Sequence, residues 1–321
     1  MTTPRRRLLA GAVLAGAGTV ARAQPAEAWP TRPVEIVVPY AAGGPADRYA
    51  RAFGNRLAEI WKQTVVISSK PGGAAAIGAA AVANAPPDGH TLLIGSTGII
   101  TNQLLLRNMP YAPAALSPLA LVAFGGGIFF VHPSVPATTA KELQAYARAN
   151  PGALKFGSSG IGSTPHLAAE LFALRAGIEI THIPYRGTAP ALTDLLAHHI
   201  NAMYDSATSI RHAREEAAGH RQHRPPTQPH LARSSYDGRE RLRRGMPDLY
   251  GFLVPSSVPA GLRRKIEADI IAAAGSAEMR EMFVQDGLDP EAMPSDAFER
   301  FLAGELVKWA EVFRTANITV Q

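Results

Sequence analysis

The chain has 321 residues, a formal net charge of +6 and no cysteine. The length allows two domains of ordinary size, and a composition of 46% apolar and 18% charged residues is that of a globular protein. The lack of cysteine excludes disulfides, thiolate metal sites and a thiol nucleophile. Four arginines before residue 23 contribute +4 and residues 219–245 contribute +5, so the remainder is net −3. The positive total therefore does not indicate a nucleic-acid partner.

The N-terminus has the three parts of an export signal. Arg5, Arg6 and Arg7 precede a short apolar run over residues 8–20, and Ala21-Arg22-Ala23 places small residues at the cleavage positions. The run is too short to span a bilayer, which needs ~20 apolar residues. We expect a signal peptide over residues 1–23, cleavage after Ala23 and a periplasmic mature protein. The general secretory and the twin-arginine routes both remain open.

A strand, a glycine turn and a helix are predicted over residues 34–60. The β-branched run at 34–38 is typical of a strand buried on both faces. Gly43 and Gly44 allow positive φ and a close approach to a ligand, and Pro45 suits the first helical position. Apolar residues then recur at helical spacing, namely Tyr49, Phe53, Leu57 and Ile60. A helix N-terminus at the end of a strand can hold an anion, although an ordinary strand-to-helix turn has the same pattern.

Two further strands follow in the same rhythm. The apolar runs at 65–67 and 91–94 each end in a glycine-bearing turn, and the small-residue stretch at 74–83 predicts a helix between them. Alternating strands and helices with short turns indicate a parallel, doubly wound sheet. All three glycine turns would then lie at the carboxyl ends of strands, where such sheets bind ligands.

A second unit begins near Gly125. We expect a strand at 128–131, a helix at 140–149 that starts with a capping box between Thr139 and Glu142, and strands at 178–183 and 200–204. A helix lies between the last two strands, with its apolar face formed by Leu192, Leu195 and Leu196.

The loop at 155–166 repeats the design of the first turn. Glycines free the backbone, Ser163 or Thr164 can cap, Pro165 opens a helix, and Leu167, Leu171 and Leu174 are expected on its buried face. The spacing Gly-x-x-Gly-x-Gly differs from the dinucleotide fingerprint, so this loop does not indicate a nucleotide cofactor.

Two basic motifs give weaker signals. Arg186 beside Tyr185 at a strand end could clamp a carboxylate, but a solvated loop arginine explains it equally well. His198-His199 has no carboxylate or histidine at ligand spacing, so we expect surface residues there and no metal site.

Six motifs in order resemble one known family. They are Trp-Pro-Thr-Arg-Pro at 29–33, Pro-Tyr-Ala-Ala-Gly-Gly-Pro-Ala-Asp at 39–47, Lys-Pro-Gly-Gly at 70–73, Pro-Asp-Gly-His-Thr-Leu-Leu at 87–93, Gly-Ser-Ser-Gly at 157–160 with Pro165-His166, and Pro-Tyr-Arg-Gly at 184–187. Each is weak alone, but together they are similar to the substrate-binding proteins of tripartite tricarboxylate transporters, the Bug receptors. The similarity spans about residues 29–218 and resumes at Gly245.

The resemblance implies a type II periplasmic binding fold with two doubly wound α/β domains, a hinge and a ligand cleft between them. Domain 1 would comprise 24–126 and 246–321, and domain 2 would comprise 127–245. It implies a monomeric receptor that binds a small organic carboxylate and has neither catalytic activity nor a cofactor. Its partners would be the large and small membrane subunits of a transporter. The implied ligand-binding residues are Tyr40, Ala42, Gly43, Gly44, Asp47, Ser96, Thr97, Ser158, Ser159, Ser163, Thr164, His166, Tyr185, Arg186, Gly187 and Asp205.

Two other functions remain open on the sequence. One is an exported hydrolase that uses Ser158, Ser159 or Ser163 with His166, but such catalysis needs a base bonded to the nucleophile and oriented by a third group. The other is a periplasmic sensor that passes its ligand state to a membrane histidine kinase, which differs from a transport receptor only in its partner.

Residues 219–245 do not fit the rest of the chain. The fold's rhythm calls for a strand here, yet the only apolar residues other than proline are Leu231, Ala232, Tyr236 and Leu242. A structureless loop of this length is unusual inside a compact domain. GC-rich codons for residues 235–242, read one base later, can encode the Glu-x-Gly ending that the family carries before Gly245. A shifted reading frame is therefore the sharper interpretation, and a solvated basic loop is the alternative.

Overall fold

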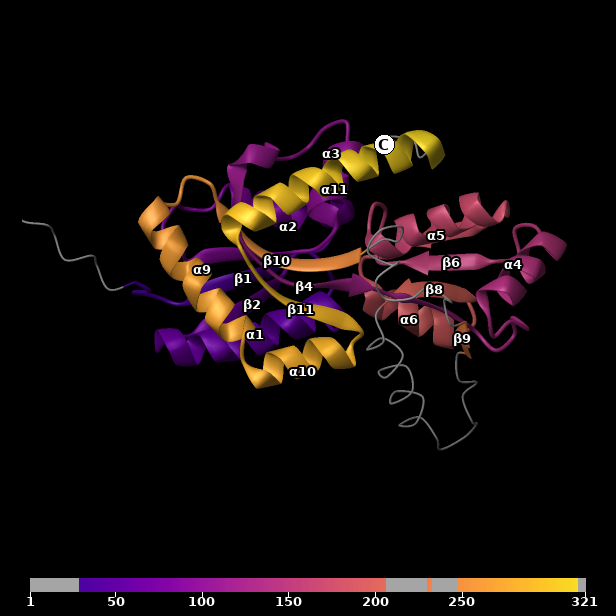
Figure 1. Cartoon of the computed structure of the whole chain (residues 1–321), viewed down its shortest axis with the longest axis horizontal. Coiled ribbons are helices and arrows are strands. Elements are labelled where there is room, and N and C mark those ends of the chain that lie inside the picture. The colour runs from indigo at the N-terminus through magenta and orange to yellow at the C-terminus, as the bar shows by residue number, and fades with distance from the viewer. Residues whose placement is uncertain (1–28, 206–229, 233–246, 317–321) are drawn as a thin grey trace, which may run out of the picture.

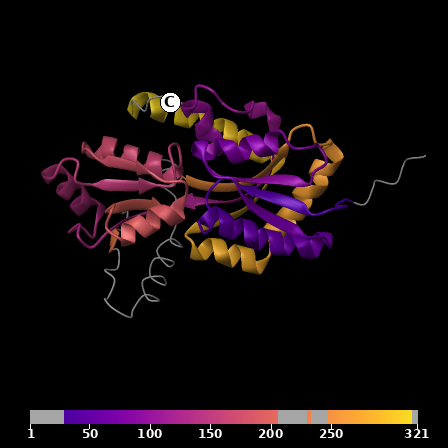
Figure 2. The same cartoon turned by 180° about the vertical axis from the view of Figure 1, so that it is seen from behind.

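The computed structural model describes residues 29–205, 230–232 and 247–316, which form two α/β domains placed end to end (Figure 1). The first domain holds a six-stranded sheet in the order β11-β4-β10-β3-β1-β2. The second holds a five-stranded sheet in the order β7-β6-β8-β5-β9. The view from behind shows helices above and below the larger sheet (Figure 2). The expected fold class is confirmed.

The first sheet is mixed. Its strands are β1 (Val34–Val38), β2 (Val65–Ser69), β3 (Thr91–Gly95), β4 (Leu116–Gly126), β10 (Pro247–Pro255) and β11 (Leu288–Pro294). β1 pairs in parallel with β2 and β3, whereas β10 is antiparallel to β3 and β4, and β11 is antiparallel to β4. The parallel pairing predicted for the strands near 34–38, 65–67 and 91–94 is confirmed by β1, β2 and β3, and it did not extend to β10 and β11. These strands enter the sheet only after the chain has returned from the second domain.

Helices cover both faces of this sheet. α1 (Pro45–Trp61), α9 (Ala260–Ala274) and α10 (Ala277–Gln285) share one apolar core; α2 (Ala76–Ala83), α3 (Gly98–Leu105) and α11 (Ser295–Ala316) contribute to the other. Single 3-10 turns occur at Gly73–Ala75 and Pro113–Ala115. The predicted stripe of α1 is confirmed, because Tyr49, Phe53 and Leu57 are fully buried against the sheet.

The second sheet is smaller and also mixed. Its strands are β5 (Ile128–Val131), β6 (Lys155–Ser158), β7 (Thr181–Pro184), β8 (Ala202–Asp205) and β9 (His230–Ala232). β6 is parallel to β7 and β8, and β5 is antiparallel to β8 and β9. α4 (Ala140–Ala149) and α5 (Thr164–Ala176) pack into one core, and α6 (Thr188–Leu196) packs into a separate one.

Gly127 is where the chain passes from the first sheet to the second. A Cβ atom at this position would lie 2.7 Å from the Asp205 carbonyl oxygen and from the Tyr204 ring, so only glycine fits. Its N–H donates a 2.7 Å hydrogen bond to the Tyr204 hydroxyl. This hydrogen bond fixes the junction to β8. The domain boundary predicted between residues 126 and 127 remains a prediction.

Within residues 219–245 the structure describes only β9, which pairs with β5 at the sheet edge. The prediction that this segment cannot bury a strand remains a prediction, because the burial of residues 230–232 lies outside what the structure describes. Very short strands are common at the edges of sheets. The rest of the segment and the predicted signal peptide lie outside the described residues.

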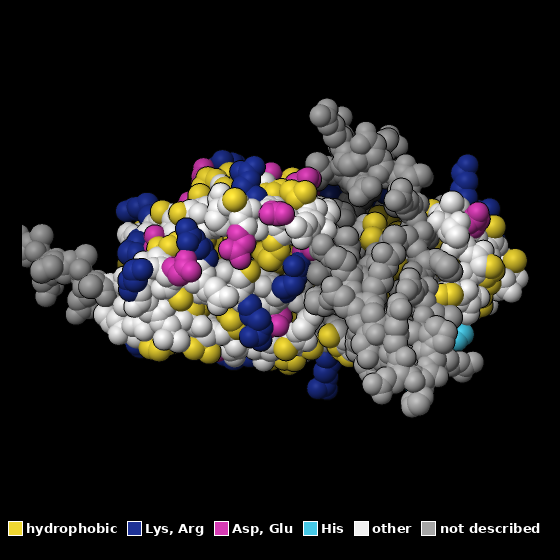
Figure 3. Space-filling model, turned by 90° about the horizontal axis from the view of Figure 1, so that it is seen from below, with side chains coloured by type: hydrophobic (Ala, Val, Ile, Leu, Met, Phe, Trp, Pro, Cys, Tyr) yellow, Lys and Arg dark blue, Asp and Glu magenta, His cyan; other side chains and the backbone are white. Residues whose placement is uncertain are grey.

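The surface of the first domain mixes both signs of charge. Seen from below, its Lys and Arg side chains are interspersed with Asp and Glu (Figure 3). Within the described ranges, none of the helices combines the length and the apolar character that a membrane span requires.

Candidate functional site

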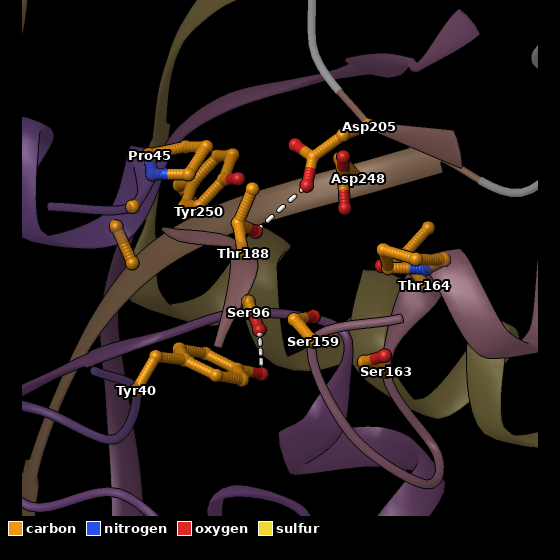
Figure 4. A pocket seen from close by; sticks show the side chains of 13 residues that line it. Tyr40, Pro45, Ser96, Ser159, Ser163, Thr164, Thr188, Asp205, Asp248 and Tyr250 are labelled. Atoms are coloured by element: carbon orange, nitrogen blue, oxygen red, sulfur yellow. Dashed lines mark hydrogen bonds between the residues drawn. The ribbon is translucent and has the colours of Figure 1, made fainter. Parts of the chain in front are cut away.

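A cavity lies between the two domains and is lined by both (Figure 4). Its lining residues are Tyr40, Gly44, Pro45, Ala46, Ser96, Ser159, Ser163, Thr164, Pro165, Thr188, Asp205, Asp248 and Tyr250. The set includes the first residues of α1, α5 and α6. Three helix N-termini therefore meet at one cavity, and each contributes partial positive charge there.

The N-terminus of α1 is built by the glycine turn. Gly43 has φ of +86°, Gly44 is the N-cap, and Pro45 opens the helix as predicted. Asp47 accepts the Gly43 N–H at 3.1 Å and pairs with Arg51 at 2.9 Å. The Asp47 carboxylate is therefore engaged within the turn itself. No side chain caps the helix, and the N–H groups of its first turn have no intrahelical acceptor.

The N-terminus of α5 is arranged in the same way. Ser163 is the N-cap, but its hydroxyl donates to the Gly160 carbonyl at 2.6 Å instead of capping the helix. Ser159 and Thr164 add hydroxyl groups to the cavity wall. These groups can donate hydrogen bonds to an anion without carrying charge.

Tyr40 and Ser96 share a hydrogen bond on the first-domain wall of the cavity. Burial raises the pKa of Tyr40 to about 12, so its hydroxyl is uncharged at neutral pH. The pair offers further neutral hydrogen-bonding atoms beside the helix N-termini.

The two domains also touch each other directly across the cleft. The Ala41 N–H donates to the Arg186 carbonyl at 3.0 Å, and the Thr101 hydroxyl donates to the Gly162 carbonyl at 2.6 Å. Gly187 makes the first contact possible, because a Cβ there would lie 3.0 Å from the Ala41 Cβ and N atoms. The arrangement is closed, and the cavity that remains is small, about 30 Å³.

The wall formed by β8 and β10 is acidic. Asp205 is 3% exposed and accepts a 2.7 Å hydrogen bond from the Thr188 hydroxyl. Asp248 is 5% exposed, and burial together with Asp205 raises its pKa to about 7. Tyr250 adds a buried hydroxyl to the same wall.

The structure brings some of the predicted site residues to the cavity and leaves others away from it. Those that line it are Tyr40, Gly44, Ser96, Ser159, Ser163, Thr164 and Asp205; those that do not are Ala42, Gly43, Asp47, Thr97, Ser158, His166, Tyr185, Arg186 and Gly187. Arg186 is exposed and contributes its carbonyl to the contact between domains. The Tyr185 hydroxyl donates to Asp194 at 2.6 Å. The predicted carboxylate clamp by Arg186 is not formed in this arrangement.

Sequence reasoning missed Thr188, Asp248 and Tyr250. Thr188 follows directly after the Tyr-Arg-Gly motif and could have been read as a helix start behind Gly187. Asp248 and Tyr250 had no such signal, because they reach the cleft through the antiparallel pairing of β10, which local sequence does not show.

The serine and histidine side chains do not form a catalytic set. His166 Nδ1 accepts the Gly162 N–H at 3.0 Å. Among the three serines considered for catalysis, Ser158 lies 2.7 Å from a histidine nitrogen, but that nitrogen is His182 Nε2 and not an atom of His166. Ser158 is fully buried, so its hydroxyl is out of reach of a substrate. The hydrolase alternative loses its geometric basis.

His166, Glu170 and His182 form a cluster whose nitrogen and oxygen atoms lie within 4.8 Å of one another. Burial lowers the pKa of His166 to about 4, and burial with His166 lowers that of His182 to about 3, so both rings are neutral at pH 7. Because His166 Nδ1 accepts a hydrogen bond, its proton sits on Nε2, the atom 3.7 Å from Glu170. The rings stack with centroids 4.0 Å apart, so their lone pairs do not converge. The cluster is better suited to hydrogen bonding than to a metal, and the expectation of no metal remains a prediction.

A larger cavity of about 270 Å³ lies between α3, β4 and α11. Its wall is mainly aliphatic and includes Glu299, and no helix N-terminus of the cleft reaches it. By its volume this cavity would be the better candidate for a ligand site. The helix N-termini that can hold an anion, however, lie at the cavity between the domains.

The comparison with protein families decides the broader class. A model described as the tripartite tricarboxylate transporter family receptor matches residues 49–318. The chain belongs to this family. Its members are solute receptors, and this chain is a receptor rather than an enzyme.

Individual relatives agree over almost the whole chain. A protein of Pseudomonas sp. strain P51, named for the tcbD-tcbE intergenic region, is 32% identical over 322 residues, which cover 96% of this chain and 93% of that protein. The structure of R. palustris Rpa4515 with adipate is 30% identical with a TM-score of 0.82, covering 91% of this chain and 100% of the other. The periplasmic binding protein BugD is 26% identical with a TM-score of 0.81, again covering 91% and 100%.

Proposed function

We propose that this receptor binds a small organic carboxylate in the cavity between its domains and delivers it to the membrane subunits of a tripartite transporter. The observation that carries the proposal is the convergence of three helix N-termini, those of α1, α5 and α6, on one cavity rich in hydroxyl groups. Such a site stabilises a carboxylate through backbone N–H groups and helix dipoles, without a basic side chain.

Domain movement would admit the ligand. The cavity of about 30 Å³ is too small for an organic acid while the two domains touch at Ala41–Arg186 and Thr101–Gly162. We infer an opening about the strands that join the domains, near Gly127, followed by closure on the ligand. A monomer in the periplasm, free of its first 23 residues, would present the closed form to the large and small membrane subunits.

The relative whose structure contains adipate supports the ligand class. It is 30% identical and covers 91% of this chain, so a carboxylate is the natural first probe.

Thermal shift against a panel of acids tests the proposal. The panel holds C4–C6 dicarboxylates, tricarboxylates, amino acids and aromatic acids, each beside a neutral amide or alcohol of the same skeleton and a chloride salt of equal ionic strength. We expect one acid to raise Tm with the logarithm of its concentration above Kd, and to bind with Kd below ~10 μM, about −7 kcal/mol. Stabilisation by neutral solutes alone would rule out a carboxylate receptor.

A further inference from the structure

Gly162 is a point at which the second domain packs tightly against the first. Its carbonyl accepts a 2.6 Å hydrogen bond from the fully buried Thr101 hydroxyl of α3. A Cβ atom at Gly162 would lie 2.3 Å from Leu105 Cδ1 and 3.7 Å from the Ala74 Cβ, so a larger residue would have to displace Leu105. The φ of +77° at Gly162 also favours glycine. The contact between the domains therefore depends on how the loop before α5 holds this residue.

His166 holds Gly162 from within the second domain. The Gly162 N–H donates to His166 Nδ1 at 3.0 Å, and both residues are buried. Because glycine has wide conformational freedom, a fixed N–H narrows the directions that its carbonyl can take. The two hydrogen bonds of Gly162 thus run in series, from His166 in one domain to Thr101 in the other.

The surroundings of His166 keep its Nδ1 atom available as an acceptor. Burial lowers the pKa values of His166 and His182, so the two stacked rings are neutral at pH 7. Glu170 Oε1 lies 3.7 Å from His166 Nε2 and favours the tautomer with the proton on that atom. His182 Nε2 lies 2.7 Å from the Ser158 hydroxyl, which accepts the Gly160 N–H at 3.2 Å. The two rings therefore fix the loop at two points.

The groups that fix the loop are not the groups that face the cavity. Among the described residues, the loop contributes Ser159 and Ser163 to the cavity wall, whereas neither Gly162 nor His166 lines it. A change at His166 thus leaves the side chains that face the ligand in place. It can reach the ligand only through the loop and through the contact between the domains.

We propose that His166 is a positioning residue for domain closure, which holds Gly162 so that its carbonyl receives the Thr101 hydroxyl when the cleft closes on a ligand. The inference rests on the receptor function proposed above and adds a residue that couples the loop to closure. In an open form the bond from Thr101 would be absent. A Gly162 that is already held in place lets this bond form without the cost of ordering the loop at that moment.

Two substitutions, one with and one without an acceptor, separate positioning from packing. His166→Asn places a carboxamide oxygen near the position of Nδ1, where it can accept the Gly162 N–H, and His166→Leu is a bulky side chain that cannot. Calorimetric titration at pH 7 with the best acid of the panel should show His166→Leu binding at least about tenfold more weakly than the wild type, and His166→Asn within about threefold of it. Equal affinities of the two variants would overturn the inference.

Thr101→Val provides the second measurement, because it removes the hydroxyl on the other side of the contact and keeps the shape of the side chain. This variant alone should bind more weakly than the wild type. If His166 acts through Gly162, the loss caused by His166→Leu should shrink from about tenfold to less than about threefold in the Thr101→Val protein. Equal losses in both backgrounds would contradict the inference. Wild-type affinity in Thr101→Val alone would contradict it even if His166→Leu failed to fold.

His198→Ala is the matched control, since it removes an exposed histidine of the same domain. It should bind the acid as the wild type does, and a loss equal to that of His166→Leu would contradict a specific role for His166. Binding of the acid by the wild type with no effect of either His166 variant would overturn this inference and leave the receptor function intact. Failure of every acid to bind the wild type would instead contradict the proposed function, and this inference with it.

Discussion

Asp248 is an acid buried against a second acid, and this position ties the stability of the protein to pH. Burial and Asp205 raise its pKa from an ordinary 3.8 to about 7. Between these values the folded chain holds a proton that the unfolded chain has released. This contribution to stability is therefore complete below pH 3.8 and is lost as the pH rises through 7.

Replacing Asp248 by asparagine should remove that loss. The quantity to compare is the difference in Tm between Asp248→Asn and the wild type. We expect this difference to be at least about 2 °C larger at pH 8 than at pH 4, in favour of the variant. The lowered pKa values of His166 and His182 act in the opposite direction, with stability falling below pH 6.5, but both proteins contain these residues. Thermal unfolding of the pair across this range measures the difference, and parallel Tm curves would show that Asp248 ionises normally.

At the residue scale, the sequence predicted the parts of the site that depend on local turn chemistry. Gly44 and Ser163 reach the cavity because a glycine turn and a serine N-cap place them at helix starts. The role of Arg186 could not be predicted from the sequence, because it depends on the neighbouring domain. Its backbone carbonyl, and not its guanidinium group, makes the contact between the domains by accepting the Ala41 N–H. The acidic wall formed by Asp205 and Asp248 could not be predicted as a unit, because no local sequence pattern shows that these two residues lie together in the cavity.

At the element scale, the turn after β1 and the turn after β7 form the contact that closes the cleft. Gly187 has φ of +145° and would bring any Cβ within 3.0 Å of Ala41. Gly187→Ala should separate the turns and lose the Ala41–Arg186 hydrogen bond, so we expect ligand affinity to fall at least tenfold, about 1.4 kcal/mol. Calorimetry with the best ligand of the panel measures the loss.

Gly152→Ala is the matched control for this prediction. Gly152 also has positive φ, +73°, but nothing lies within 4 Å of its Cβ position. Both variants place alanine at a positive φ, although the conformation of Gly187, with φ +145° and ψ 172°, is the less accessible of the two to alanine. The clash between domains arises only in Gly187→Ala. Equal affinities in the two variants would mean that the turn contact has no part in binding.

The helices that follow strong local signals were predicted accurately. α4 spans Ala140–Ala149 with the predicted capping box between Thr139 and Glu142, and α1 begins at Pro45. β7 was placed three residues early at its start, because the apolar stretch begins before its ladder with β6. Leu174, expected on the buried face of α5, is 46% exposed, since the sheet covers only part of that helix.

At the scale of the whole molecule, the class of fold was predictable and its connectivity was not. Alternating strands and helices indicated two α/β units, and the motifs indicated their family. The antiparallel return of β10 and β11 depends on pairing between segments more than 100 residues apart, which no local period encodes. The frameshift interpretation of residues 219–245 remains a prediction, and resequencing the gene through this region tests it.

The cleft is also where the two domains act as one unit. Residues from α1, α5, α6, β8 and β10 reach the same cavity, so a ligand bound there contacts both sheets at once. Binding energy gained at these contacts favours the closed arrangement over the open one. The central claim is therefore that an acid binds between the domains at the helix N-termini.

Calorimetric titration of the best acid into wild type, Gly44→Val and His198→Ala tests this claim most directly. A Cβ at Gly44 has room, with Thr188 Cβ 3.7 Å away, but the two further methyl groups of valine would occupy the cavity beside the α1 N-terminus. We predict that Gly44→Val melts cooperatively and does not bind, while His198→Ala binds within about 0.5 kcal/mol of the wild type. Wild-type affinity in Gly44→Val, or lost binding in His198→Ala, would place the ligand somewhere other than the cleft.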